Sequence, residues 1–107
     1  MTYTVVISER TAQEIEGATA WWARERSAEQ AVRWYQGIRG AIAGLATSPE
    51  RCPLAAESAA FPFEIRELHY GLGRRPTHRA VFRITDEQVL VLTVRHVAQD
   101  QLRPEDL

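Results

Sequence analysis

The sequence predicts an α+β domain with the element order β-α-α-β-β-β, in which an antiparallel helix hairpin packs on one face of a small, mostly antiparallel sheet. Three observations support this prediction. A short β-branched segment lies at residues 3–7, and two segments with helical spacing follow at 11–26 and 27–48. Strand-like segments then occupy residues 63–69 and 78–97. The second half of the chain therefore supplies most of the sheet.

The last of these segments is predicted to form the central hairpin of the sheet. Apolar and other residues alternate over His78–Ile84, which is the period of two that a strand with two different faces requires. Residues 85–88 provide a polar turn, and Val89–Val94 is an apolar, β-branched run that is typical of a central strand. Three arginines lie within these strands rather than in loops: Arg79, Arg83 and Arg95.

Each predicted helix begins at a capping box, Thr11-Ala-Gln-Glu14 and then Ser27-Ala-Glu-Gln30. The connection between the helices is short, which predicts an antiparallel pair, and Ser48-Pro49 ends the second helix. Glycine weakens a helix by up to about 1 kcal/mol relative to alanine. We therefore expect close approach to the first helix or to the sheet at three positions of the second helix: Gly37, Gly40 and Gly44.

Composition indicates one domain, residues 1–107, with a core that needs no disulfide or structural metal. The net charge of −1 gives no general reason to expect a nucleic-acid or membrane partner. All 13 basic residues are arginine, which reflects either a compositional bias or a use for bidentate phosphate contacts. No signal peptide and no run of about 18 apolar residues is present, so a cytoplasmic protein is expected.

Cysteine and histidine give no metal pattern, so neither a metal nor another cofactor is expected. Cys52 is the single cysteine, and the three histidines are scattered. His78 and His96 lie at opposite ends of the hairpin strands and are not expected to be neighbours. His96 follows Arg95 at a strand end, which makes it the better acid–base candidate.

The arginines are the stronger functional signal. Arg66, Arg79, Arg83 and Arg95 are expected on the sheet face turned away from the helices, where they need water, carboxylates or phosphates. Four nearby acidic residues offer salt bridges as the alternative: Glu64, Glu67, Asp86 and Glu87. A functional role is favoured for Arg79 and Arg95, and both interpretations stay open for Arg83.

Two further groups of residues have a structural and a functional interpretation. Gly71-Leu-Gly73-Arg74-Arg75 lacks the third glycine and the following helix of a phosphate-binding loop. It is predicted to be an exposed loop, whose Arg74 and Arg75 remain available to a phosphate backbone or an acidic partner. Three tryptophans flank the apolar helix stripe and are assigned to packing, although an outer aromatic could mark an interaction surface: Trp21, Trp22 and Trp34.

Together these segments resemble the RelE/ParE superfamily of bacterial type II toxins, also called plasmid stabilisation proteins. The early strand and capped helix pair fit in order, and so do the motifs Arg66-Glu-Leu, His78-Arg-Ala-Val-Phe-Arg-Ile, Val94-Arg-His96 and Gln99-Asp100. The resemblance implies a growth-inhibiting toxin that a cognate antitoxin holds inactive in a hetero-oligomer. The target is either the ribosome, where RelE-like members cleave mRNA without a metal, or DNA gyrase.

The resemblance also suggests roles for particular residues. Arg79 and Arg95 would stabilise the phosphorane of a cleaved mRNA, and His96 would act as general acid or base. Gln99 stands where ribonuclease members tend to carry another arginine, so enzymatic activity stays open. We expect four arginines to contact the substrate: Arg66, Arg74, Arg75 and Arg83. The alternative is a non-toxic binding module that retains only the fold and the antitoxin interface.

Overall fold

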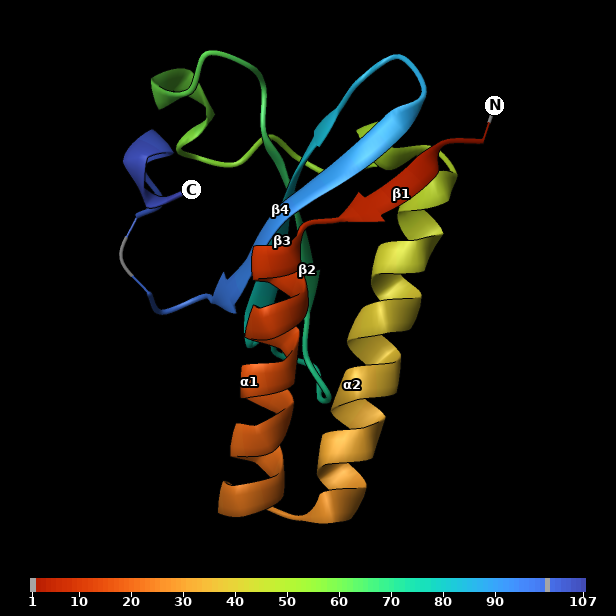
Figure 1. Ribbon diagram of the computed structural model, residues 1–107, viewed down its shortest axis with the longest axis vertical. Coiled ribbons are helices and arrows are strands. Elements are labelled where there is room, and N and C mark those ends of the chain that lie inside the picture. The colour runs from red at the N-terminus through yellow and green to blue at the C-terminus, as the bar shows by residue number, and fades with distance from the viewer. Residues whose placement is uncertain (1, 100) are drawn as a thin grey trace.

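A computed structural model describes residues 2–99 and 101–107 and confirms the predicted α+β architecture (Figure 1). The elements in chain order are β1 (Thr4–Ile7), α1 (Glu9–Glu25), α2 (Ala28–Ala43), β2 (Arg66–Tyr70), β3 (His78–Ile84) and β4 (Gln88–His96). The sheet order is β1-β4-β3-β2. β1 runs parallel to β4, whereas the other neighbours are antiparallel, so β3 and β4 are central as predicted.

The first helix begins earlier than its predicted capping box. Ser8 is the N-cap, and its hydroxyl accepts a hydrogen bond from the Thr11 backbone N–H at 3.0 Å. Thr11 is instead buried within the first turn, where its hydroxyl donates to the Val91 carbonyl of β4. The prediction of Thr11 as the cap was wrong because Ser8, the residue that directly follows β1, takes the capping role.

The second helix begins as predicted and ends sooner. Ser27 caps it by accepting from the Gln30 N–H at 3.1 Å, but α2 stops at Ala43 and a 3₁₀ turn follows. A side chain at Gly37 would overlap the Tyr70 hydroxyl, so the close approach is real there. The prediction of close approach was wrong for Gly40 and Gly44. A side chain at Gly40 would meet open space, and one at Gly44 would only touch the Arg51 guanidinium at 3.9 Å.

Two apolar clusters lie on the two faces of the sheet. The helix-side cluster contains Trp34, Ile38 and Phe82, all fully buried. The cluster on the opposite face is smaller and includes Ile65, Val81 and Leu102. Leu102 is buried although most of the described residues around it in the C-terminal segment are exposed, and Asp100 lies outside the described residues.

The C-terminal segment is fixed at two places. The Leu102 N–H donates to the Glu57 carboxylate at 2.9 Å, and the Arg10 guanidinium of α1 donates to the Asp106 carbonyl. Figure 1 shows this segment beside the loop that precedes β2. That loop is irregular, with short 3₁₀ turns at Pro49–Arg51 and Ser58–Ala60. The segment therefore covers the sheet face that the helices leave uncovered.

Candidate functional site

Arg79 lies at the centre of a buried ion-pair network on the sheet face opposite the helices. It is only 9% exposed, although it sits near the start of β3. Its Nη1 donates to Glu57 Oε1 at 3.0 Å and to Glu67 Oε2 at 2.6 Å, and its Nη2 donates to Glu57 Oε2. Two carboxylates therefore balance the charge of this arginine within the chain.

The Glu57 carboxylate of this network is held in its charged form. Hydrogen bonds from Arg79 lower the pKa of Glu57 to about 2, against the opposing effect of burial. The same hydrogen bonds raise the pKa of Arg79. Glu67 was one of the four predicted salt-bridge partners, whereas Glu57 was not, because it lies in the irregular loop 22 residues before Arg79.

Arg95 stands directly opposite Arg79 in the register of β3 and β4. Its half-buried side chain lines a polar cavity of about 520 Å³ together with Arg10, Glu14 and Arg103. Glu14 also fixes the adjacent backbone, since its carboxylate accepts from the Thr93 hydroxyl at 2.8 Å and from the Val94 N–H at 3.0 Å. The end of β4 is thus held in place by the first turns of α1.

The four arginines predicted to contact substrate do not converge. Arg66 pairs with Phe82 in the sheet and donates to the Cys52 carbonyl at 2.6 Å, so it lies on the helix side and not with Arg79. The Arg83 guanidinium lies 4.0 Å from the centroid of the Phe63 ring. Arg74 and Arg75 are exposed in the loop between β2 and β3, as predicted. Expectation of a shared arginine face therefore holds for the hairpin arginines but not for Arg66.

His78 and His96 are neighbours, contrary to the prediction. They are register partners across β3 and β4, with ring centroids 5.3 Å apart. The error lies in the geometry of a hairpin, because the start of its first strand and the end of its second strand meet at the same edge. His78 also packs edge-on against the buried Trp34, with centroids 4.9 Å apart.

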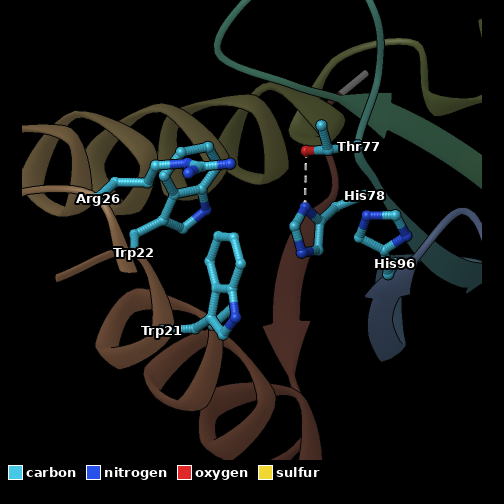
Figure 2. Close-up of a pocket in the computed structure, with 7 residues that line it drawn as sticks. Trp21, Trp22, Arg26, Thr77, His78 and His96 are labelled. Atoms are coloured by element: carbon cyan, nitrogen blue, oxygen red, sulfur yellow. Dashed lines mark hydrogen bonds between the residues drawn. The ribbon is translucent and has the colours of Figure 1, made fainter. Parts of the chain in front are cut away.

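These two histidines line a largely apolar cavity of about 370 Å³ between α1 and the strand ends. Figure 2 shows that Trp21 and Trp22 of α1, and Arg26 just after the helix, lie across it from His78 and His96. Trp21 is 42% exposed and meets Trp22 edge to face at 5.4 Å, so only Trp34 of the three tryptophans is a pure core residue. The packing assignment was therefore incomplete for Trp21.

The two imidazoles have different hydrogen-bonding states. Burial, followed by the effect of His96, lowers the pKa of His78 to about 4, so this ring is neutral near pH 7. Its Nδ1 is 2.8 Å from the Thr77 hydroxyl, which can donate or accept. His96 Nδ1 accepts from the Ala98 N–H at 3.0 Å. A neutral His96 therefore carries its proton on Nε2.

Comparison with known proteins identifies the family. A family model described as the ParE toxin of the type II toxin–antitoxin system parDE matches residues 5–101. The chain belongs to the ParE toxin family. It is thus the toxin type of a type II toxin–antitoxin system, and the resemblance to the RelE/ParE superfamily is confirmed. No curated protein matches the sequence.

Solved structures agree with the fold of this ParE-family chain. The chromosomal ParDE toxin–antitoxin system from P. aeruginosa superposes with a TM-score of 0.73 at 16% identity, covering 90% of this chain and 97% of the other. The RelBE2 toxin–antitoxin complex from Mycobacterium tuberculosis gives a TM-score of 0.48 at 24% identity, over 90% and 99% of the two chains. At these identities, the first likeness supports the fold alone.

Several residues that shape this ParE-family site had no sequence signal. Glu57 and Glu14 come from a loop and a helix that are distant from β3 and β4 in the sequence, and Thr77 precedes β3. The pairing of His78 with His96 was accessible, because it follows from antiparallel register. Among residues 2–99 and 101–107, no group of three or more potential metal-binding side chains is found. None of the described helices is long and apolar enough to span a membrane.

Proposed function

We propose that this ParE-family toxin arrests bacterial growth in the cytoplasm by binding DNA gyrase, and that a cognate antitoxin holds it inactive in a hetero-oligomer. One observation carries the choice of gyrase over mRNA cleavage. The guanidinium of Arg79 is buried between Glu57 and Glu67. A phosphorane dianion would have to compete with two carboxylates for this arginine, which opposes a role for Arg79 in phosphoryl chemistry.

Exposed apolar side chains support an antitoxin partner. Val32 and Tyr35 on α2 are 53% and 39% exposed, and Val6 on the edge strand β1 is 39% exposed. A partner chain that lies along α2 and the edge strand β1 would cover these side chains. The P. aeruginosa structure is likewise described as a toxin–antitoxin system.

Ribosome-dependent mRNA cleavage is the second candidate, and the strand end of β4 favours it. His96 is exposed, its tautomer is set by the Ala98 N–H, and Arg95 is its neighbour. An imidazole that is accessible beside a cation could exchange a proton with a ribose hydroxyl. Arg79 does not complete that site, because Glu57 and Glu67 hold its guanidinium. Arg10 and Arg103 line a neighbouring polar cavity with Arg95, but the carboxylates of Glu14 and Asp106 line the same cavity.

Growth and two biochemical assays test these candidates. Induction of the toxin alone should arrest growth, and co-expression with its antitoxin should restore it. Purified toxin should inhibit supercoiling by gyrase, while primer extension on a translated message should show no new cleavage sites. New cleavage sites with normal supercoiling would replace the gyrase proposal by the ribonuclease, and normal growth at confirmed expression would favour the non-toxic binding module.

Point variants separate the two mechanisms further. Arg95→Ala and His96→Ala should leave gyrase inhibition and growth arrest largely intact, because neither change touches the core. A ribonuclease would lose its activity in both. Arg79→Ala is unsuitable for this test, since removing the partner of a buried carboxylate also destabilises the fold.

A further inference from the structure

We propose that the cavity between α1 and the ends of β3 and β4 binds an unpaired nucleobase of a single-stranded nucleic acid. This site is separate from the gyrase proposal and does not depend on it. The walls come from Trp21 and Trp22 on one side and from His78 and His96 on the other (Figure 2). Aromatic and imidazole rings of this kind are the surfaces on which proteins stack unpaired bases.

The size of the cavity fits one base. Its volume of about 370 Å³ lies at the lower end of the range for small-ligand sites, roughly 300–1,000 Å³. The exposed Trp21 ring borders it, so a ligand can reach the aromatic surface from solvent. A planar group therefore fits this space better than a helix or a folded partner.

Hydrogen bonding favours a base over a purely apolar group. His96 Nε2 is a fixed donor, because its Nδ1 is used by the Ala98 N–H. His78 is adaptable, because the Thr77 hydroxyl can serve its Nδ1 as donor or acceptor and thereby allows either tautomer. Each base edge carries both donors and acceptors, and these two rings can match such a pair. An apolar side chain in the cavity would form no hydrogen bond with either imidazole.

The indole N–H of Trp22 points to the same class of ligand. It is buried and has no hydrogen-bond acceptor in the described part of the chain. An unsatisfied N–H is costly, and an acceptor on a base would satisfy it. Access to this N–H requires a shift of the Trp21 ring, which is 42% exposed and meets Trp22 edge to face.

Basic residues around the cavity suit the phosphates that accompany a base. Arg26 lines the cavity, with its guanidinium 5.7 Å from the centroid of the Trp21 ring. Arg74 and Arg75 are exposed three and two residues before Thr77, which also lines it. None of the three arginines has an ion-pair partner within residues 2–99 and 101–107. They are therefore available to a phosphate backbone.

The test titrates the full chain with nucleoside monophosphates, a mixed-sequence single-stranded RNA of eight nucleotides, the same sequence as single-stranded DNA, and a DNA duplex. Binding is followed by the NMR signals of the three indole N–H groups. We expect the signals of Trp21 and Trp22 to shift while that of the core residue Trp34 stays fixed. Single strands should bind, and the relative affinity of RNA and DNA identifies the natural source. The duplex should bind at least tenfold more weakly because its bases are stacked and paired.

Two exposed aromatic residues provide a matched pair of variants. Trp21→Ala removes a cavity wall, whereas Tyr35→Ala removes a ring of similar exposure on α2 that also lies beside an arginine. Loss of one stacking ring should lower single-strand affinity about fivefold to a hundredfold in Trp21→Ala and leave Tyr35→Ala unchanged. Arg26→Ala should weaken binding of the monophosphates but not of the unphosphorylated nucleosides.

Three outcomes would overturn the proposal: no shift of Trp21 or Trp22 at millimolar nucleotide, equal affinity for duplex and single strand, or equal losses in Trp21→Ala and Tyr35→Ala. Shifts caused only by an antitoxin peptide would assign the cavity to a protein partner instead. Gyrase inhibition is measured on the same variants. Because it is a separate readout, failure of base binding and failure of the gyrase proposal remain distinguishable.

Discussion

The two faces of the sheet give neighbouring residues of the same hairpin opposite charge states. On the face away from the helices, Arg79 is buried and keeps its charge because Glu57 and Glu67 neutralise it. On the helix side, His78 lies next to it in the sequence, yet its ring is held neutral beside His96 at the edge of an open cavity. Because successive side chains of a strand point to opposite faces of the sheet, these two adjacent residues lie in different environments.

This contrast shows that a basic residue inside a strand does not by itself mark a functional site. The arginine side is closed by its own carboxylates and by the C-terminal segment at Leu102. The histidine side retains donors, acceptors and aromatic surface that the chain does not use. Arg79 is thus enclosed within the chain, whereas His78 and His96 border an open, largely apolar cavity and Arg95 borders a polar one.

The largest expected effect tests the closed side. Arg79→Ala leaves Glu57 as a buried carboxylate without its partner, which should lower the free energy of unfolding by about 3–5 kcal/mol. Urea denaturation measures the change. In the double variant Arg79→Met with Glu57→Gln, which removes both charges, much of this loss should be recovered. A stable Arg79→Ala single variant would contradict the buried network.

The dependence of stability on pH distinguishes the two faces of the sheet, and on the arginine face it arises from Glu57. Its pKa is about 2 in the folded chain against 4.5 for the free group, so the unfolded state binds more protons between these values. Stability is therefore complete above pH 4.5 and falls as the pH drops towards 2, by roughly 3 kcal/mol. Urea denaturation at a series of pH values should show this fall, and Glu57→Gln should flatten it. An unchanged slope in Glu57→Gln would show that other carboxylates cause it.

Protonation of His78 should lower the stability of the chain at higher pH values than protonation of Glu57 does. Its pKa is about 4 when folded and 6.5 when free, so the unfolded state again binds the extra proton. Stability is present above pH 6.5 and declines by roughly 2–3 kcal/mol as the pH falls to 4. In the His78→Phe variant, the same denaturation series should show no loss of stability between pH 6.5 and 4 from this residue, while the loss due to Glu57 should remain. Equal slopes in the two chains between pH 6.5 and 4 would contradict a neutral, partly buried His78.

The smallest expected effect concerns packing beside the histidine side. Tyr70 is the register partner of His78, and a methyl group at Gly37 would overlap its hydroxyl. Gly37→Ala should therefore destabilise the chain by about 1–3 kcal/mol. Gly40→Ala is the matched control in the same helix, because its side chain meets open space, and it should stabilise by up to about 1 kcal/mol. Thermal melting that ranks the two variants the other way would contradict this packing.

Local patterns in the sequence were sufficient for the elements and much of their arrangement. Period-two alternation located β3, an apolar β-branched run located β4, and Ser27 was identified as the cap of α2. The cap of α1 was misassigned to Thr11, because two hydroxyl residues three positions apart offer the same local signal and only burial against Val91 separates them. Element type therefore follows from spacing more reliably than element ends do.

The candidate site was only partly predictable. Arg79, Arg95 and His96 were predicted as the candidate catalytic residues, and the register of β3 and β4 places the first two opposite each other. The sequence did not indicate that Glu57 would neutralise Arg79, because the two are joined by a loop without any period. Nor did it indicate that Trp21 of α1 and His96 of β4 would line one cavity.

By itself, the sequence determined the α+β class, the order of the elements and the resemblance to the RelE/ParE superfamily, because these depend on the order and spacing of residues along the chain. Only the tertiary structure decided which basic residues are neutralised and which remain accessible. The physical reason is that charge compensation and cavities arise between residues that are distant in sequence and adjacent in space. Arg79 beside Glu57, and His78 beside His96 and Trp21, are contacts of this kind.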